Sequence, residues 1–179
     1  MVHVEWDRAH DEFDAIVHAE SDEGVIVSRV HDIVPLRGFK WLPRNEIVSI
    51  EPLEADSTPM RLAALRGTAP ASLDTGLTHL SNLLAHLKAS SDLVGVFRAE
   101  RGSDELLVGR IKGAEKLLVV DLVSPGGVWQ DEERYELGEI ISIEWQSDYL
   151  LALADLLPAR EPESDVVRRP LREQSHHRS

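Results

Sequence analysis

The chain has 179 residues, of which 42% are hydrophobic and 28% charged, a balance typical of a globular protein rather than a disordered one. Its 32 acidic and 19 basic side chains leave a net charge of −13, which disfavours a nucleic acid as partner because affinity for phosphates comes from Lys and Arg. The absence of cysteine excludes disulfides and thiolate chemistry, and without a signal peptide or a long apolar run we expect a cytoplasmic protein with no membrane span.

The first region, residues 1–58, reads as short β-branched runs separated by polar turns. The runs lie at 15–19, 25–34, 38–42 and 47–52. Four strands of this length do not make a stable flat sheet alone, so the pattern favours a small curled barrel that buries one face and hides its edges. With 13 acidic and 5 basic residues, this region is strongly acidic.

Residues 59–90 form a linker with one amphipathic helix. Five leucines recur at spacings of 4, 3, 4 and 3, which places them on one helical stripe. They are Leu73, Leu77, Leu80, Leu84 and Leu87. Asp74 or Thr75 is a candidate N-cap, and Gly76 weakens the first turn. The stripe predicts a helix that packs on one or both barrels.

The second region, residues 91–157, repeats the β-rich pattern with runs at 93–99, 106–112, 117–123, 134–137 and 140–145. A Pro- and Gly-containing insertion at 124–134 is typical of a turn. A closing helix is expected at 149–157, stopped by Pro158. The remainder, 158–179, is polar and charged and predicts a disordered tail, in which 168–172 is a candidate docking motif.

An internal repeat is the strongest single pattern. The hexapeptide at 46–51 recurs at 139–144 with five identities and one Val-for-Ile exchange. Upstream, 25–30 resembles 106–111 and 14–17 resembles 92–95, in the same order. Preserved order indicates duplication of one β unit rather than chance.

Two features between 77 and 157 are especially specific, the turn Ser124-Pro125-Gly126-Gly127 and the helix start 147–150. With them, this part of the chain resembles a class of small uncharacterised bacterial proteins with Sm-like domains, which are small open β-barrels, often in tandem. The resemblance implies a fold and no activity. The expected fold class is therefore mainly β with α (α+β): two tandem small Sm-like barrels linked by an amphipathic helix, with a short C-terminal helix and a disordered tail.

No motif carries catalytic chemistry. The sequence lacks a phosphate-binding glycine loop, a nucleophile elbow and a dinucleotide fingerprint. His79 and His86 are seven residues apart, or ~10.5 Å along a helix, too far to share one ion. We therefore expect no enzyme, no metal and no cofactor; a hydrolase would need a buried polar cleft.

Four residues are candidates for binding. Arg29 and Arg110 fall at matching places in the aligned runs, and Trp41 and Trp129 are possible stacking platforms for bases. Cross-strand ion pairs and core closure are the structural alternatives for these residue types. The preferred function is a non-enzymatic interaction or scaffold protein whose barrel edges bind a protein partner or a second copy. The alternative is an Sm-like regulator that binds RNA or DNA.

Overall fold

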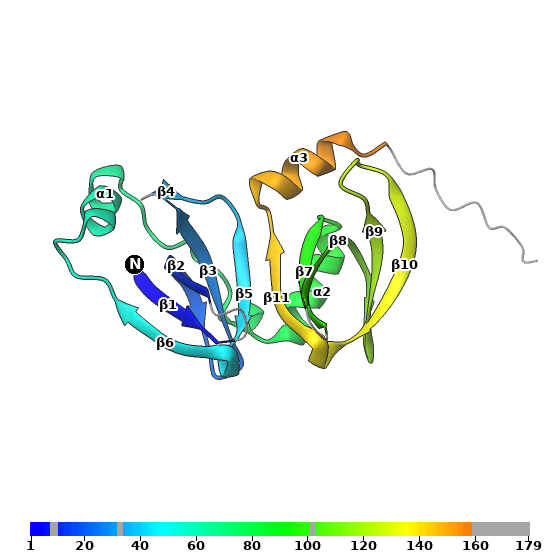
Figure 1. Ribbon diagram of the computed structural model, residues 1–179, viewed down its shortest axis with the longest axis horizontal. Coiled ribbons are helices and arrows are strands. Elements are labelled where there is room, and N and C mark those ends of the chain that lie inside the picture. Colours follow the sequence, from blue (N-terminus) through cyan, green and yellow to red (C-terminus); the bar gives the residue numbers. More distant parts are fainter. Residues whose placement is uncertain (8–10, 32–33, 101–102, 159–179) are drawn as a thin grey trace, which may run out of the picture.

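A computed structural model describes residues 1–7, 11–31, 34–100 and 103–158 (Figure 1). The strands are β1 Val2–Trp6, β2 Asp11–Glu20, β3 Gly24–His31, β4 Val34–Pro35, β5 Phe39–Pro43, β6 Ile47–Pro52, β7 Val94–Glu100, β8 Ser103–Ala114, β9 Leu117–Val123, β10 Trp129–Glu136 and β11 Ile140–Trp145. The helices are α1 Thr58–Arg66, α2 Leu80–Ser90 and α3 Asp148–Leu156, with short 3-10 turns η1 Arg44–Glu46, η2 Thr75–Thr78 and η3 Leu137–Glu139.

Ten strands form one continuous antiparallel sheet in the order β10-β9-β8-β7-β11-β5-β3-β2-β1-β6, and β4 adds to β3. The β-rich content expected from the sequence is confirmed. The prediction of two separate barrels linked by a helix is wrong, because β11 of the C-terminal half pairs with β5 of the N-terminal half and the sheet does not close.

The β5–β11 junction explains why separate barrels do not form. Ile143 lies opposite Trp41, and the rings of Phe39 and Trp145 lie 5.4 Å apart at the same junction. An unpaired strand edge leaves a row of backbone groups without partners. Each half satisfies one such edge with the other half, so the two halves share a backbone ladder (Figure 1).

The two halves, residues 2–52 and 94–145, nevertheless have the same strand order. The N-terminal half runs β6-β1-β2-β3-β5 and the C-terminal half runs β11-β7-β8-β9-β10. This order matches β1 with β7, β2 with β8 and β3 with β9. The two upstream sequence matches, which paired β3 with β8 and β2 with β7, are each displaced by one strand, because the short first strand β1 was not expected.

The repeated hexapeptide does form equivalent strands. Both copies begin in a one-turn 3-10 segment, η1 or η3, and continue as β6 or β11. Ile47 lies opposite Trp6, Ile140 lies opposite Arg98, and in each ladder the register shifts immediately after that pair. The bulge therefore leaves Val48 and Ile141 at the same unpaired position.

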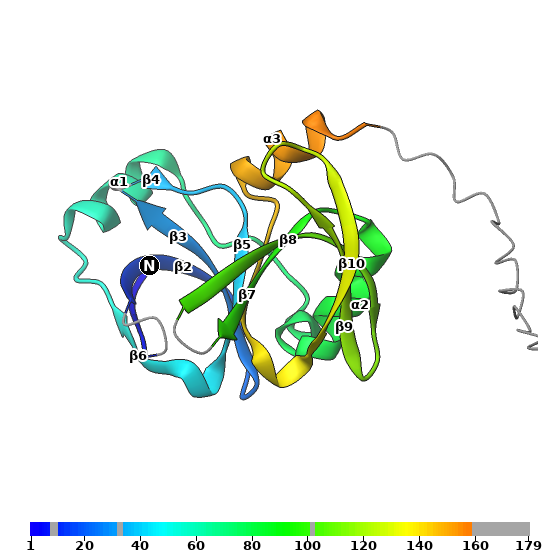
Figure 2. The same cartoon turned by 45° about the vertical axis from the view of Figure 1, so that its right-hand side comes forward.

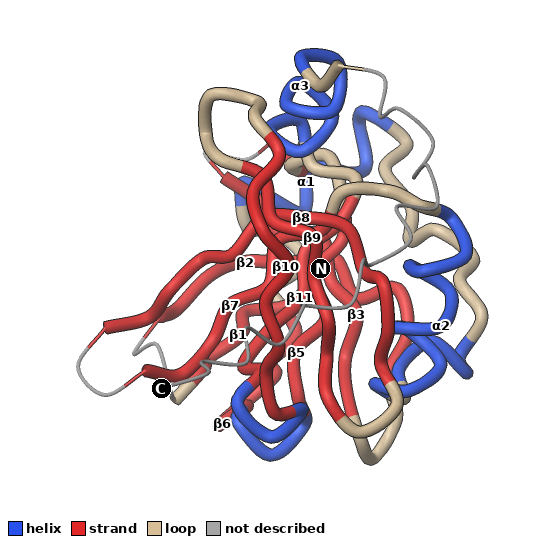
Figure 3. Tube along the Cα trace, turned by 90° about the vertical axis from the view of Figure 1, so that its right-hand side faces the viewer, coloured by secondary structure: helices blue, strands red, loops and turns tan. Residues whose placement is uncertain are grey.

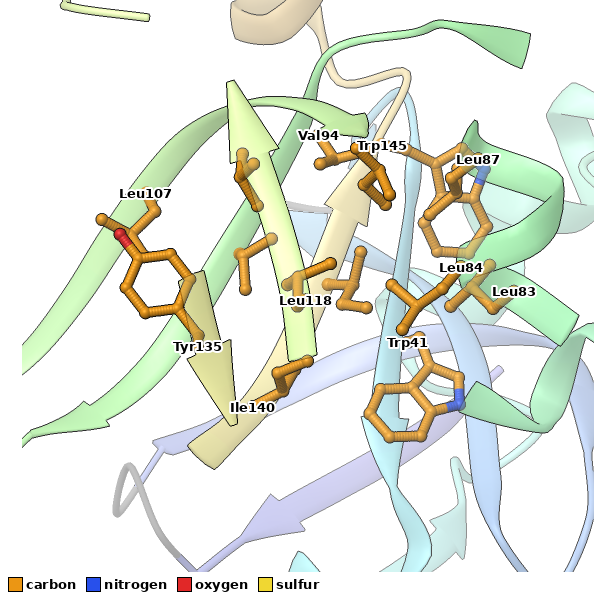
Figure 4. Close-up of a cluster of buried hydrophobic side chains, with 14 of the residues drawn as sticks. Trp41, Leu83, Leu84, Leu87, Val94, Leu107, Leu118, Tyr135, Ile140 and Trp145 are labelled. Carbon is orange, nitrogen blue, oxygen red and sulfur yellow. The ribbon is translucent and has the colours of Figure 1, made fainter. Parts of the chain in front are cut away.

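Helix α2 covers the core of the sheet rather than linking two barrels. Its buried leucines face Trp41 and Trp145, one tryptophan from each half (Figure 4). Leu84 and Leu87 belong to the predicted stripe, and the equally buried Leu83 does not. Figure 3 shows α2 on one side of the strands and α3 across one end. The amphipathic helix thus contributes to a core that both halves share.

Other elements differ in detail from the prediction. Helix α1 was not expected, and it has no buried residue. The insertion at 124–134 is a turn only at its start, because β10 already begins at Trp129. Helix α3 follows β11, with Ser147 as its N-cap: the Ser147 Oγ accepts a hydrogen bond from the Leu150 N–H at 3.4 Å. The predicted disordered tail from 159 onward, with its motif at 168–172, lies outside the described residues.

Candidate binding site between the two halves

A cavity of about 250 Å³ opens where β5 meets β11. Its walls come from β3, from the segment 36–40 that enters β5, from Glu144 near the end of β11 and from residues 147–149 at the start of α3. The site therefore exists only because the two halves share a junction: segments more than 100 residues apart in the chain form its two sides.

Gly38 allows these two sides to approach. Its φ of +97° lies in the left-handed region, where a side chain causes strain. A Cβ at this position would also lie 2.6 Å from the backbone nitrogen of Ser147 and 2.7 Å from its Cα. Glycine is therefore required for the 36–38 turn to reach the N-terminus of α3.

The cavity is largely apolar. Val27 and Phe39 contribute to its lining, and the side chains of Leu36 and Tyr149 are both exposed at it. Exposed large apolar side chains that gather around a concavity are typical of binding surfaces. The four residues come from both halves of the chain.

Charged groups surround this apolar lining. Arg29 forms an ion pair with Asp11 at 3.0 Å, and Arg37 lies 4.0 Å from the Asp148 carboxylate. Glu144 also lines the cavity, and in the β5–β11 ladder it lies directly opposite Lys40. The cavity thus offers an apolar surface with charged groups of both signs around it.

A chain of hydrogen bonds that runs through His18 and Ser28 holds the carbonyl of Gly38 in the turn. The Ala71 N–H donates to Nδ1 of His18 at 2.8 Å, Nε2 of His18 lies 2.8 Å from Ser28 Oγ, and the Ser28 hydroxyl donates to the Gly38 carbonyl at 2.6 Å. Because Nδ1 accepts, the neutral ring carries its hydrogen on Nε2 and donates to Ser28. Burial lowers the pKa of His18 below its usual 6.5. The ring also lies edge-on to Phe39.

Lys40 connects the two halves beneath the cavity. Its side chain is only 7% exposed, and Nζ lies 4.6 Å from the ring centre of Trp6 and 4.5 Å from that of Phe97. Trp6 belongs to the N-terminal half and Phe97 to the C-terminal half. An ammonium between two aromatic faces is attracted to both, so Lys40 helps to hold the halves together.

Of the predicted binding residues in the N-terminal half, only Arg29 reaches the cavity. Its guanidinium lies over the Phe13 ring at 4.3 Å and pairs with Asp11. Trp41 is 2% exposed, and its Nε1–H donates to the carbonyl of Thr78 at 2.7 Å. Trp41 therefore closes the core and offers no ring face to a ligand.

The other two predicted residues lie together at a different place. The guanidinium of Arg110, on β8, lies 5.0 Å from the ring centre of Trp129, at the start of β10. Arg29 is on β3 and Arg110 on β8, and these strands are not equivalent in the sheet order. The structure thus does not give the two arginines matching positions, and it does not bring the four residues into one site.

Sequence reasoning missed the residues that define the cavity. Leu36 and Tyr149 lie in a turn and at a helix start, where nothing local indicates exposure beside a concavity. Nothing in the local sequence distinguishes Lys40 or Glu144 from other charged residues of a strand. The only available signal was the resemblance of 147–150 to a helix start, which was read as architecture alone.

Among the described residues, no cluster of three or more His, Cys, Asp or Glu side chains is arranged to hold a metal ion. No helix in the same part of the chain is long and apolar enough to cross a membrane. The resemblance of 77–157 to Sm-like proteins stays a prediction. No protein-family model, curated protein or solved structure matches this chain.

Proposed function

We propose that this protein is a non-enzymatic interaction protein whose junction cavity receives an apolar side chain of a protein partner. The supporting observation is the exposure of Leu36 and Tyr149 at an apolar cavity that both halves build. Buried aromatic and aliphatic anchors commonly contribute most of the affinity at protein interfaces.

The size of the cavity favours a side chain over a cofactor. Pockets for small molecules and cofactors commonly measure ~300–1,000 Å³. At about 250 Å³ the cavity is smaller, and Leu36 and Tyr149, which line it, are both exposed. One aromatic or branched aliphatic side chain with its backbone outside suits this space.

Charge favours a partner segment with a basic residue beside its apolar anchor. Glu144 and Asp148 both line the cavity, and the whole chain carries −13. A nucleic acid is the weaker candidate, because Arg29 pairs with Asp11, Lys40 is buried, and the exposed Arg37 has the Asp148 carboxylate 4.0 Å away. Paired and buried cations release few counterions on binding phosphate.

The test uses blocked tripeptides Lys-Phe-Lys, Lys-Gly-Lys and Glu-Phe-Glu, titrated into isotope-labelled full-length protein and followed by backbone amide shifts. We expect Lys-Phe-Lys alone to shift the amides of Gly38 and Tyr149. Tyr149→Ala and Glu144→Gln should each weaken this binding by about threefold or more, while Tyr149→Phe retains it.

Equal shifts with the glycine peptide, or shifts spread away from the cavity, would contradict the proposal. A labelled single-stranded oligonucleotide provides the competing outcome: if it binds wild type with a steep salt dependence and Arg37→Ala weakens it, the partner is a nucleic acid instead.

A further inference from the structure

The ten-strand path ends at β6 and β10, which lie on opposite sides of the molecule (Figures 1 and 2). Among the described strands, β6 pairs with β1 only and β10 with β9 only. The outer edge of β6 therefore has backbone groups that no described strand engages. Such an edge accepts an added strand when its side chains allow it.

Strand β6 is the counterpart of β11, the strand that already accepts a neighbour. The two strands share their hexapeptide, their preceding 3-10 turn and the same register against β1 and β7, including the bulge. Because the backbone geometry repeats, the groups that β11 offers to β5 correspond to those that β6 offers outward.

The side chains at the bulge show what the β6 edge lacks. Ile141 of β11 is 1% exposed and packs among residues of the N-terminal half, such as Leu42. Its counterpart Val48 is 57% exposed. Strand β6 thus keeps an apolar side chain at the bulge, and no described strand pairs with its outer edge to bury Val48.

The internal junction also shows which strand chemistry fits. Residues 143–145 of β11 lie opposite residues 39–41 of β5, with Glu144 opposite Lys40 and aromatic rings on either side of the lysine. In β6, Glu51 stands in the place of Glu144. Opposite charges across a strand pair are favourable, so a lysine is the residue that Glu51 would select.

From this equivalence we infer that the outer edge of β6 binds an extended segment of another protein, with a lysine between two aromatic or large aliphatic residues. The segment would run antiparallel to β6 and place its lysine opposite Glu51. This edge is remote from the junction cavity and would operate whether or not the cavity binds a ligand.

A second copy of this chain fits the edge poorly. Counting back from η3, residues 132–134 of β10 occupy the place that 39–41 of β5 occupy before η1. A head-to-tail pairing would set Glu133 against Glu51 and Glu132 against Pro52. Like charges directly opposite each other destabilise a ladder, so the acidic β10 discourages this head-to-tail pairing.

Pro52 limits how strongly any segment binds. The Leu53 N–H donates to the Met1 carbonyl at 3.3 Å, which makes Val2 and Pro52 a non-hydrogen-bonded pair. An N–H at position 52 would therefore point outward, and proline has none. The edge offers one donor fewer than β11, so the bound segment depends on side-chain contacts with Val48 and Glu51.

The probe is a synthetic peptide with the sequence of residues 37–43, Arg-Gly-Phe-Lys-Trp-Leu-Pro, compared with a version that carries Glu in place of its Lys. Binding to full-length protein is followed by fluorescence anisotropy, and its place by the amide shifts of residues 48–51. We expect the Lys peptide to bind and to shift these amides. Glu51→Lys should weaken the Lys peptide about threefold or more and favour the Glu peptide.

Matched variants separate the alternatives. Glu54→Lys makes the same charge change just beyond β6 and should leave the preference for the Lys peptide unchanged. Shifts at 143–145 instead of 48–51, or equal binding of both peptides to wild type and Glu51→Lys, would overturn the inference. A wild-type dimer in light scattering that Glu51→Lys dissociates would assign the edge to a second copy and overturn it too.

Discussion

Replacing Trp41 by Phe tests whether this indole is a core group. The Trp41 Nε1–H is the hydrogen-bond donor to the buried Thr78 carbonyl, and phenylalanine has no such donor. A buried acceptor left without a partner costs about 1–3 kcal/mol. The smaller ring also leaves a void beside Leu84, which adds about 1 kcal/mol. We expect the free energy of unfolding to fall by roughly 2–4 kcal/mol.

For a chain of this length, each kcal/mol corresponds to about 2–4 °C, so Tm should fall by roughly 4–16 °C. The measurement is thermal and urea unfolding by circular dichroism, with Leu65→Ala as control. Leu65 is 82% exposed, and its truncation should change stability by less than about 0.5 kcal/mol. A Tm for Trp41→Phe within 1 °C or so of the control would refute this account and return Trp41 to the candidates for ligand stacking.

Three further predictions concern stability. The pKa of Glu23 is held below its usual 4.5, first by its hydrogen bond with His79 and then by the Leu80 N–H at the start of α2. The stability that the Glu23 carboxylate contributes is therefore present above pH 4.5 and is lost as pH falls through the lowered pKa. In Tm measured against pH, Glu23→Gln should be less stable than wild type near neutrality, and the two should converge in acid. The pKa of His18 is also lowered, so as pH falls the unfolded chain takes up a proton on this histidine before the folded chain does, and wild type loses stability below pH 6.5. The denaturation midpoint of His18→Gln should therefore vary less than that of wild type between about pH 7 and 5. An equal pH dependence of the two midpoints would contradict the lowered pKa of His18. A Cβ on Gly109 would lie 2.1 Å from the Asp121 carbonyl oxygen, so Gly109→Ala should lower Tm more than Gly67→Ser does, and a variant as stable as wild type would be unexpected.

Local features of the fold were predictable from the sequence, but the pairing of its two halves was not. The apolar runs identified most strands, because period and composition are local properties. The leucine stripe identified α2 only from Leu80 onward, since Leu73 precedes the 3-10 turn η2 and Leu77 lies in it. The pairing of β5 with β11 joins Trp41 to Ile143, and no local property of either strand names its neighbour. The prediction of two separate barrels assumed that each half pairs its own edge strands with each other.

The candidate site was unpredictable for a related reason. Residue type selected Trp41 and Trp129 as stacking groups, but type does not reveal that Trp41 lies under α2. The cavity depends on a turn at Gly38 meeting a helix start at Ser147. Such a meeting follows from the junction, so an error about the junction removes the site as well.

The repeated hexapeptide shows where sequence reasoning works and where it stops. Its two copies do form strands with the same register, so the repetition correctly indicated equivalent backbones. It did not reveal that one copy, with Ile141, is covered while the other, with Val48, is exposed. Burial depends on neighbours, which differ between an inner strand and an edge strand.

The junction also sets an order of events during synthesis. Trp41 leaves the ribosome 102 residues before Ile143, the residue that will lie opposite it. At a synthesis rate of ~5–20 residues per second, roughly 5–20 s pass before β11 is available to pair with the edge of β5. During that interval a nascent chain presents the backbone of an aromatic-rich strand to its surroundings. A fragment limited to the N-terminal half, residues 1–52, should therefore aggregate or recruit chaperones, although the five strands of its path, β6-β1-β2-β3-β5, are complete.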